Sequence, residues 1–282
     1  MTEFDELRRR AWAGRAEAYA ETMGRLCAHA VEALLDAAQV AAGTRVLDVG
    51  TGPGTVAAVA LARGAQVVAI DPSPDMRALA QRNAPGAEVH DGALPHLRYP
   101  DATFDAVVAN FVLNQVGDPR IAVVELARVC RPGGRVAVSI WPRPASPVHR
   151  LWEDVIEASG ARLPATLATL PPERDFERTE AGLAGVLADA GLNDVAAVTV
   201  TFTHRVDPEL WWSGPARGVA SIGTVFASQT AEVAASMRAH YDRLSAPYLA
   251  DDGLLHLPAC AVVGSGEVDA SSAVVASGVG GG

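Results

Sequence analysis

The order of apolar and polar positions along the chain predicts alternating strands and helices in its first half. Apolar runs of strand length occupy residues 45–50, 65–71, 87–92, 104–112 and 135–141. Between them, segments with helical periodicity occupy residues 55–64, 74–83 and 119–130. The strands are continuously apolar, which is typical of a parallel sheet that is buried on both faces. The pattern therefore predicts an α/β fold with helices on both sides of a parallel sheet.

The flanking segments have different patterns. Apolar residues recur at helical spacing over 12–38, which predicts one long helix. Downstream, a helix is expected at 179–192, a strand at 194–206, mainly helix over 207–250 with one helix at 230–244, and a last strand at 253–266. An irregular segment is expected after the fifth strand because prolines recur there, at Pro142, Pro144, Pro147, Pro164, Pro171 and Pro172. The Gly- and Ser-rich stretch 267–282 predicts disorder.

Composition narrows the class of protein. A formal net charge of −10 disfavours a nucleic-acid partner, because such binding depends on clustered cations. The three cysteines are far apart and form no zinc-binding pattern, so no metal site is expected. The first residues lack the apolar stretch of a secretion signal, and no apolar run reaches the roughly 20 residues of a membrane span. We therefore expect a cytoplasmic protein, monomer or homodimer, that binds neither nucleic acid nor membrane.

A glycine-rich loop follows the first strand. It reads VLDVGTGPGTV over residues 46–56, with glycines at Gly50, Gly52 and Gly54. In open parallel sheets ligands bind at the carboxyl ends of the strands, and glycine lets the backbone approach them closely. Short glycine loops are also ordinary turns, so the loop alone is weak evidence.

Three acids at successive strand ends strengthen that evidence. Asp48 lies beside the loop, Asp71 ends the second strand and Asp91 ends the third. An acid beside the loop suits a cation better than a phosphate, Asp71 is placed to accept ribose hydroxyls, and Asp91 is placed to accept an adenine amino group. The combination fits S-adenosylmethionine (SAM), a sulfonium with no phosphate. Each acid alone is more often a turn residue or a helix cap, and Asp71 is a candidate cap for the helix at 74–83.

At this point the sequence resembles the class I SAM-dependent methyltransferases. Four segments occur in that family's order: VLDVGTGPGT, VVAIDPSPDM, DATFDAVVANFVLNQVGDP and ELARVCRPGGRVAVSIW. The nearest type is that of ubiquinone and menaquinone biosynthesis, and the match covers about residues 12–152. The resemblance implies a Rossmann-like, seven-stranded, mostly parallel sheet whose last strand is antiparallel, together with a helical lid. The strand at 253–266 would be the antiparallel one, inserted beside the strand at 194–206.

The resemblance also implies roles for residues. Asp48 and Gly50 would lie near the methionine moiety, Asp71 would hold the ribose, and Asp91 with the Gly92 backbone would read adenine. The full set expected at the cofactor is Tyr19, Asp48, Gly50, Thr51, Gly52, Gly54, Asp71, Pro72, Met76, Asp91, Gly92, Ala93, Asn110 and Phe111. The acceptor is expected to contact Trp12, Asn114, Trp141, Trp211 and Trp212.

The family's pattern is not followed everywhere. The link from Asp91 to YPDATFD is about two residues longer than expected, and Asn114 and Gln115 stand where many relatives carry histidine. A general base is needed only for an acceptor whose proton must leave early. His96 is the first candidate and His204 the second, although a lone histidine is usually structural. Each tryptophan alone is likewise more often a packing residue than a ligand contact.

These expectations define four segments and a function. Residues 1–42 would form an N-terminal helical cap, 43–142 the SAM-binding core, 143–266 the rest of the sheet with the lid, and 267–282 the tail. The predicted function is methyl transfer from SAM to an oxygen or nitrogen of a small organic molecule, with natural-product biosynthesis as the expected setting. Two alternatives stay open: a nicotinamide-dependent oxidoreductase, and a SAM-binding protein without transferase activity.

Overall fold

The computed structural model describes residues 2–167 and 169–269, and its centre is one seven-stranded sheet. The strand order is β3–β2–β1–β4–β5–β7–β6, and only β7 runs antiparallel to its neighbours. The strands are β1 (Arg45–Val49), β2 (Gln66–Ile70), β3 (Glu88–His90), β4 (Phe104–Asn110), β5 (Cys130–Ile140), β6 (Leu192–Val206) and β7 (Leu255–Val268). The predicted fold class, with its antiparallel last strand inserted between β5 and β6, is confirmed.

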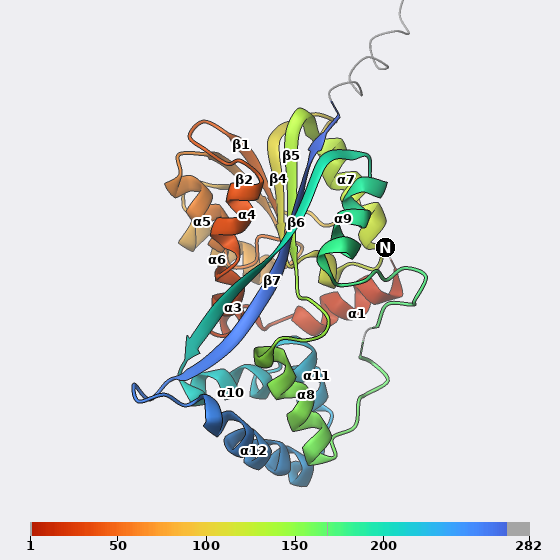
Figure 1. Cartoon of the computed structure of the whole chain (residues 1–282). Helices are drawn as coiled ribbons and strands as arrows, with labels where there is room; N and C mark the ends of the chain where they lie inside the picture. Colours follow the sequence, from red (N-terminus) through yellow and green to blue (C-terminus); the bar gives the residue numbers. More distant parts are fainter. Residues whose placement is uncertain (1, 168, 270–282) are drawn as a thin grey trace, which may run out of the picture.

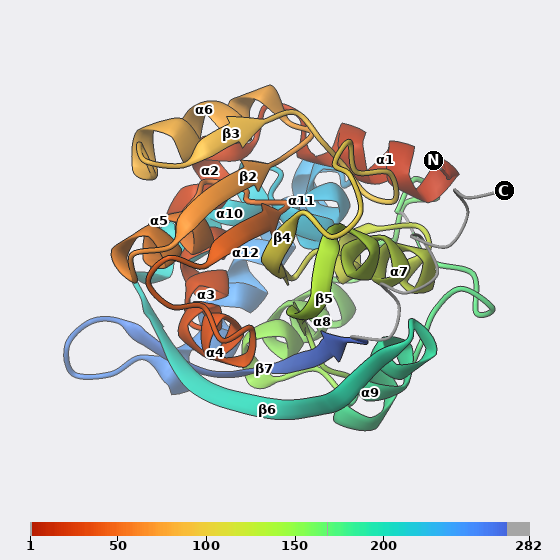
Figure 2. The same ribbon diagram turned by 90° about the horizontal axis from the view of Figure 1, so that it is seen from above.

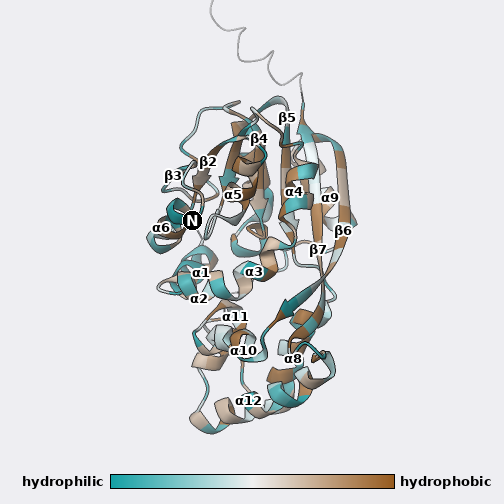
Figure 3. Cartoon of the chain, turned by 90° about the vertical axis from the view of Figure 1, so that its left-hand side faces the viewer, coloured by the Kyte–Doolittle hydropathy of each residue, from teal (hydrophilic) through white to brown (hydrophobic). Residues whose placement is uncertain are grey.

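Helices cover both faces of the sheet (Figures 1 and 2). On one face α7 (Pro119–Val129) and α9 (Glu180–Asp189) pack against buried side chains such as Leu47 and Val107. On the other face α4 (Val31–Ala37) and α5 (Thr55–Ala62) pack against Val46 and Val108. Figure 3 shows the same division, with apolar strands inside and more polar helices outside. Strands buried on both faces explain the continuously apolar runs in the sequence.

A helical lid gathers where β6 and β7 extend beyond the other strands (Figure 1). Residues 256–261 of β7 pair only with β6, because β5 ends at Ile140, opposite Val262. Buried side chains of the lid pack against Val206 and Leu257 at this end. Its helices are α8 (Pro147–Ser159), α10 (Pro208–Ala216), α11 (Ala220–Ala227) and α12 (Ala231–Ser245), followed by the turn η2 (Ala246–Tyr248). The lid therefore stands over the carboxyl ends of the parallel strands.

The N-terminal prediction of one helix over 12–38 is wrong. The chain forms α1 (Glu3–Trp12), α2 (Ala16–Glu21), α3 (Met23–Ala28) and α4, with the first helix in a segment that shows little apolar periodicity. Gly14 has a φ of +70°, and Thr22 has a φ of −118° with a ψ of −93°, so neither continues a helix. Of these short helices, α4 packs on the sheet, whereas α2 contacts α6 and α10 and α3 contacts α5.

Three further boundaries differ from the sequence prediction. The RPGG stretch at 131–134 is an irregularity within β5, not a loop before it: Phe104 pairs with Cys130, and Ala106 pairs with Arg135. The expected irregular segment after β5 contains the 13-residue helix α8, with Pro147 in its permitted first turn. Residues 267 and 268 of the predicted tail belong to β7, and 270–282 lie outside the described residues.

The remaining elements connect these layers. Helix α6 (Pro74–Asn83) follows β2 and packs beside α5, and the turn η1 (Leu113–Gln115) follows β4. None of the helices in the described ranges is long and apolar enough to cross a membrane. The division into segments at residues 42, 142 and 266 stays a prediction.

Candidate functional site

The glycine loop between β1 and α5 is held by left-handed backbone and by close neighbours. Gly50, Gly52 and Gly54 have φ values of +68°, +54° and +86°. A Cβ on Gly54 would lie 2.8 Å from the Cα of Ala80, so this glycine lets α5 approach α6. At Gly50 the space that a Cβ would need is filled by the side chain of Val112, 2.6 Å away. The glycines therefore serve packing within the chain as well as the expected ligand approach.

Asp48 is a buried carboxylate with one unused oxygen. Its side chain is 1 % exposed, its Oδ2 accepts a 2.6 Å hydrogen bond from Thr51 Oγ1, and its Oδ1 has no partner among the described residues. Burial raises the pKa of Asp48 to about 7; the charge of Asp71 acts in the same direction, whereas the Thr51 hydroxyl and the Ala57 backbone N–H oppose it. Buried polar atoms nearly always have a partner, so the free oxygen indicates a missing donor or cation.

Asp71 ties the glycine loop to the end of β2. Its Oδ2 accepts from the Gly52 backbone N–H at 3.0 Å, and its Oδ1 accepts from the Ser73 N–H at 2.9 Å. Burial raises the pKa of Asp71 above its usual range. The cap of α6 is Ser73, whose Oγ accepts from the Met76 N–H, so the alternative that Asp71 itself caps this helix is wrong. Each carboxylate oxygen keeps acceptor capacity for a ligand hydroxyl.

Asp91 lies beside Asp71, as expected for neighbouring strand ends, but it is exposed and paired. Arg77 donates from one nitrogen to Asp91 Oδ1 at 2.9 Å and to the Asp71 carbonyl at 2.8 Å. Of the other residues expected at the adenine end, Met76 is buried, whereas Gly92 and Ala93 are partly exposed and Pro72 is exposed. A Cβ on Gly92 would lie 3.1 Å from Ile70, so this backbone is close to β2.

A hydrogen-bond network fixes the residues after β4. Ser139 Oγ donates to Asn110 Oδ1 at 2.6 Å and accepts from the Phe111 N–H at 2.9 Å. Phe111 has a φ of +58°, and its ring stacks on Trp141 with centroids 3.8 Å apart. Asn114 Oδ1 accepts from the Trp141 N–H at 3.3 Å. The predicted residues Asn110, Phe111, Asn114 and Trp141 are thus brought together, supported by a buried serine that the sequence analysis missed.

The N-terminal helices cover the glycine loop. The Tyr19 ring lies 3.7 Å from the position of a Cβ on Gly52, and Trp12 meets Tyr19 edge to face with centroids 5.2 Å apart. The Tyr19 hydroxyl donates to Cys27 Sγ at 3.4 Å, and burial raises the pKa of Tyr19 well above its usual value. Tyr19 therefore lies over the glycine loop with Trp12 against it, and their contacts with cofactor and acceptor stay predictions.

Arg8 and Gln115 join this cover to the rest of the site, and the sequence analysis missed both roles. Gln115 Oε1 accepts from Arg8 Nε at 2.7 Å, from Arg8 Nη2, and from Trp12 Nε1 at 3.2 Å. Arg8 Nη1 donates to Ser221 Oγ in the lid at 3.3 Å. Burial lowers the pKa of Arg8 to about 10. No local sequence signal marks these long-range contacts.

The surroundings of the two candidate bases favour His204, the second choice, over His96, the first. His96 is exposed on the loop after β3, near Glu125 of α7, and none of the hydrogen bonds of Asp48 or Asp71 involves it. His204 is 2 % exposed, and its Nδ1 lies 3.3 Å from His29 Nε2. His96 therefore has no support as a base from its surroundings, whereas His204 lies under the lid.

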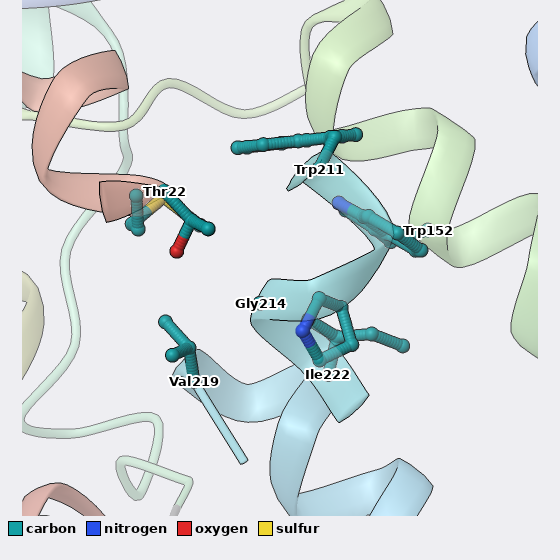
Figure 4. Close-up of a pocket in the computed structure, with 8 residues that line it drawn as sticks. Thr22, Trp152, Trp211, Gly214, Val219 and Ile222 are labelled. Carbon is teal, nitrogen blue, oxygen red and sulfur yellow. The ribbon is translucent and has the colours of Figure 1, made fainter. Parts of the chain in front are cut away.

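The tryptophans of the lid have two kinds of surroundings. Trp211 borders a small cavity of about 10 Å³ with Thr22, Trp152, Gly214, Val219 and Ile222 (Figure 4). Trp212 instead meets Phe226 edge to face and lies under the guanidinium of Arg238, within the lid's own core. The packing interpretation therefore describes Trp212 better than the expected acceptor contact. No group of three or more metal-ligating side chains occurs within residues 2–167 and 169–269.

Comparison with known proteins finds methyltransferases. A family model described as "Methyltransferase domain" matches residues 47–138. A demethylmenaquinone methyltransferase of Clavibacter sepedonicus is 39% identical over 118 residues, which are 40% of this chain and 48% of that protein. Another protein with this name, from Beutenbergia cavernae, is 30% identical over 177 residues, 60% of this chain and 74% of that protein. The chain spans about half the length of the first three such relatives.

Solved structures resemble the fold at lower identity. YcgJ from Bacillus subtilis has a TM-score of 0.53 at 18% identity, covering 86% of this chain and 98% of that one. A putative methyltransferase from an antibiotic biosynthesis pathway of Anabaena variabilis has a TM-score of 0.54 at 16% identity, covering 83% and 95%. At these identities the likeness concerns the fold alone.

Proposed function

The chain belongs to the class I SAM-dependent methyltransferases, and on that premise we propose that it transfers a methyl group from SAM to an oxygen or nitrogen of a small organic molecule. The unpartnered, buried Asp48 Oδ1 beside the glycine loop is the observation that carries this proposal. A buried acid without a donor or cation is costly, and a cationic ligand next to it lowers that cost.

The residues present fit this cofactor. Asp48 would face the positively charged methionyl part, and Asp71, already fixed by two backbone N–H groups, would accept the ribose hydroxyls. Asp91 and the Gly92 backbone stay the predicted adenine contacts. When bound, SAM supplies a methyl group already activated by its sulfonium. The chain's part is to bind, to orient the acceptor and to exclude water under Tyr19 and the lid.

The aromatic surroundings favour an aromatic acceptor of low charge. Phe111, Trp141 and Phe202 belong to one cluster between the strand ends and the lid, together with Met23 and Tyr19. Apolar and aromatic linings with few polar groups are typical of small-molecule sites. A role in natural-product biosynthesis stays part of this proposal. Because the named relatives act on demethylmenaquinone, that acceptor belongs in the first assay.

Labelled SAM offered with demethylmenaquinol and a panel of phenols and amines tests the proposal. We expect label on an oxygen or nitrogen of the product and S-adenosylhomocysteine (SAH) as the co-product, together with thermal stabilisation by SAH and none by NAD. Label on a ring carbon of demethylmenaquinol would show methyl transfer but contradict the expected acceptor atom. Stabilisation by NAD instead would favour the oxidoreductase, and binding of SAH without turnover of any acceptor would favour a SAM-binding protein without transferase activity.

A further inference from the structure

Two neighbouring rings under the lid carry buried polar atoms without partners. His204 Nε2 and Trp211 Nε1 have no hydrogen-bond partner among the described residues, and both side chains are 2 % exposed. The two rings meet edge to face, with centroids 5.1 Å apart. Leaving a buried polar group unsatisfied costs roughly 1–3 kcal/mol, so two at one place indicate a ligand group that both would bind.

A second histidine, His29, contacts the other ring nitrogen of His204. His29 Nε2 lies 3.3 Å from His204 Nδ1, and His29 is exposed and stacked on Phe202 with centroids 4.7 Å apart. The charged groups that act on His204 are His29 and Arg25, and with burial they lower the pKa of His204 to about 4. His204 is therefore a neutral imidazole at neutral pH, with one ring nitrogen donating and the other accepting.

The two unpartnered atoms can then be described as a hydrogen-bond acceptor and a hydrogen-bond donor. When His204 Nδ1–H donates to His29, His204 Nε2 offers a lone pair, while Trp211 Nε1–H offers a proton. A hydroxyl group, which both donates and accepts, satisfies the two at once. An ether or carbonyl oxygen can only accept, so in this tautomer it would leave His204 Nε2 unpaired. In the other tautomer, where His29 donates to His204 Nδ1, a hydroxyl oxygen still satisfies the site by accepting from both N–H groups.

The two rings have aromatic surroundings and one small cavity beside them. Trp211 also borders the cavity of about 10 Å³, which has room for one water-sized group between Thr22, Trp152 and Ile222 (Figure 4). His29 follows Cys27 by two residues, and the Cys27 carbonyl accepts from Asn110 Nδ2 at 3.2 Å. The aromatic cluster of Phe111, Trp141 and Phe202 spans the region from Asn110 to His29.

We propose that His204 and Trp211 form a hydroxyl-recognition site at the end of the acceptor pocket remote from the cofactor, so that the acceptor is an aromatic compound bearing a hydroxyl there. This inference rests on the proposed methyl transfer for the identity of the pocket. Its role is to select the acceptor; the hydroxyl that it binds is not the reacting atom.

Binding of three rod-shaped probes in the presence of SAH tests it: biphenyl-4-ol, biphenyl and 4-methoxybiphenyl, by calorimetry. We expect biphenyl-4-ol to bind at least about tenfold more tightly than the other two, because a site built for a hydroxyl rejects analogues that lack it. His204→Phe and Trp211→Phe should each bring the ratio to near one while leaving the affinity for SAH unchanged.

His149→Phe is the matched control. His149 Nε2 is also buried and unpartnered, but its ring lies against Trp141 with centroids 4.4 Å apart, and burial likewise lowers its pKa to about 4. This variant should keep the tenfold ratio. Equal binding of all three probes by the unaltered protein, or loss of the ratio in His149→Phe alone, would overturn the proposal.

The two proposals fail in different ways. If SAH does not bind, the methyltransferase proposal fails before any probe is added. If SAH binds and the probes are not distinguished, only the hydroxyl-recognition site fails. Should His204→Phe not fold, Trp211→Phe still tests the site, and a shift of the Trp211 indole N–H resonance on adding biphenyl-4-ol, absent with biphenyl, provides a second measurement.

Discussion

Asp48 should couple cofactor binding and stability to pH. In the unfolded chain this carboxyl loses its proton near pH 3.8, whereas in the folded protein burial holds the proton up to about pH 7. Between those values the native state binds more protons than the unfolded state. The free energy of unfolding therefore falls as pH rises through this window, and Asp48 has no such effect below it.

The magnitude follows from the two pKa values. Their separation, from 3.8 to about 7, corresponds to at most roughly 4 kcal/mol of lost stability above pH 7. Asp48→Asn removes the charge and keeps an oxygen that can accept from Thr51 Oγ1. About half of this loss has already occurred at pH 5.5, so between pH 5.5 and pH 8.5 we expect the melting temperature of the variant to rise by roughly 4 to 8 °C relative to that of the unaltered protein.

The affinity for a cationic cofactor should rise with pH, whereas the stability of the free protein falls. A cationic ligand favours the ionised form of Asp48, so binding of SAM at pH 6 should release nearly one proton and at pH 8.5 none. Calorimetry in two buffers of different ionisation enthalpy measures this release. Asp48→Asn should release no proton at either pH and should bind SAM roughly 10- to 150-fold more weakly at pH 8.5.

Two results would refute this reasoning. Melting temperatures of the two proteins that stay parallel from pH 5.5 to 8.5 would show that Asp48 does not titrate in the window. Proton release that persists in Asp48→Asn would assign the linkage to another group. Asp71 is the neighbour to examine in that case, because burial also raises its pKa.

The remaining predictions concern the supports of the site. Asp71→Ala should weaken SAH binding about 10- to 150-fold and, because it leaves two backbone N–H groups without an acceptor, should also lower the melting temperature; unchanged affinity would count against the ribose role. Gln115→Leu removes the acceptor of Arg8 and should lower the free energy of unfolding by about 1–3 kcal/mol in denaturant titration. Gly54→Ala should destabilise by at least about 1 kcal/mol, because its Cβ would meet Ala80 and its φ is +86°. Methyl transfer should persist in EDTA; loss of activity that magnesium restores would contradict this.

The sheet could be predicted from the sequence because its signals are local. Continuously apolar strands, helices with regular periodicity and a glycine loop after β1 each lie within about ten residues, and they define a parallel sheet. The grouping of Asp48 and Asp71 followed from the same pattern, since the carboxyl ends of neighbouring parallel strands share one edge. The antiparallel last strand came from the family resemblance and not from any local signal.

The cover over the site could not be predicted in the same way. The apolar residues over 12–38 keep their helical spacing on either side of Gly14 and Thr22. The periodicity therefore does not show that the helix breaks at these two positions. The contacts of Arg8 with Gln115 and of His29 with His204 join residues 107 and 175 positions apart. Such pairs depend on tertiary packing, which gives an individual histidine or arginine no distinguishing neighbours in sequence.

The buried acids and the residues that cover them together make the site selective for a cationic ligand. Two carboxyls, Asp48 and Asp71, lie in one buried region; burial raises the pKa of both, and the charge of Asp71 adds to the cost of ionising Asp48. Tyr19 on Gly52 and Val112 on Gly50 close the loop, so water cannot solvate these charges freely. A ligand must displace part of this cover to reach Asp48. A neutral ligand would gain little there, whereas a cation gains the attraction of a poorly solvated carboxylate, and this difference favours a charged sulfonium over its neutral thioether product.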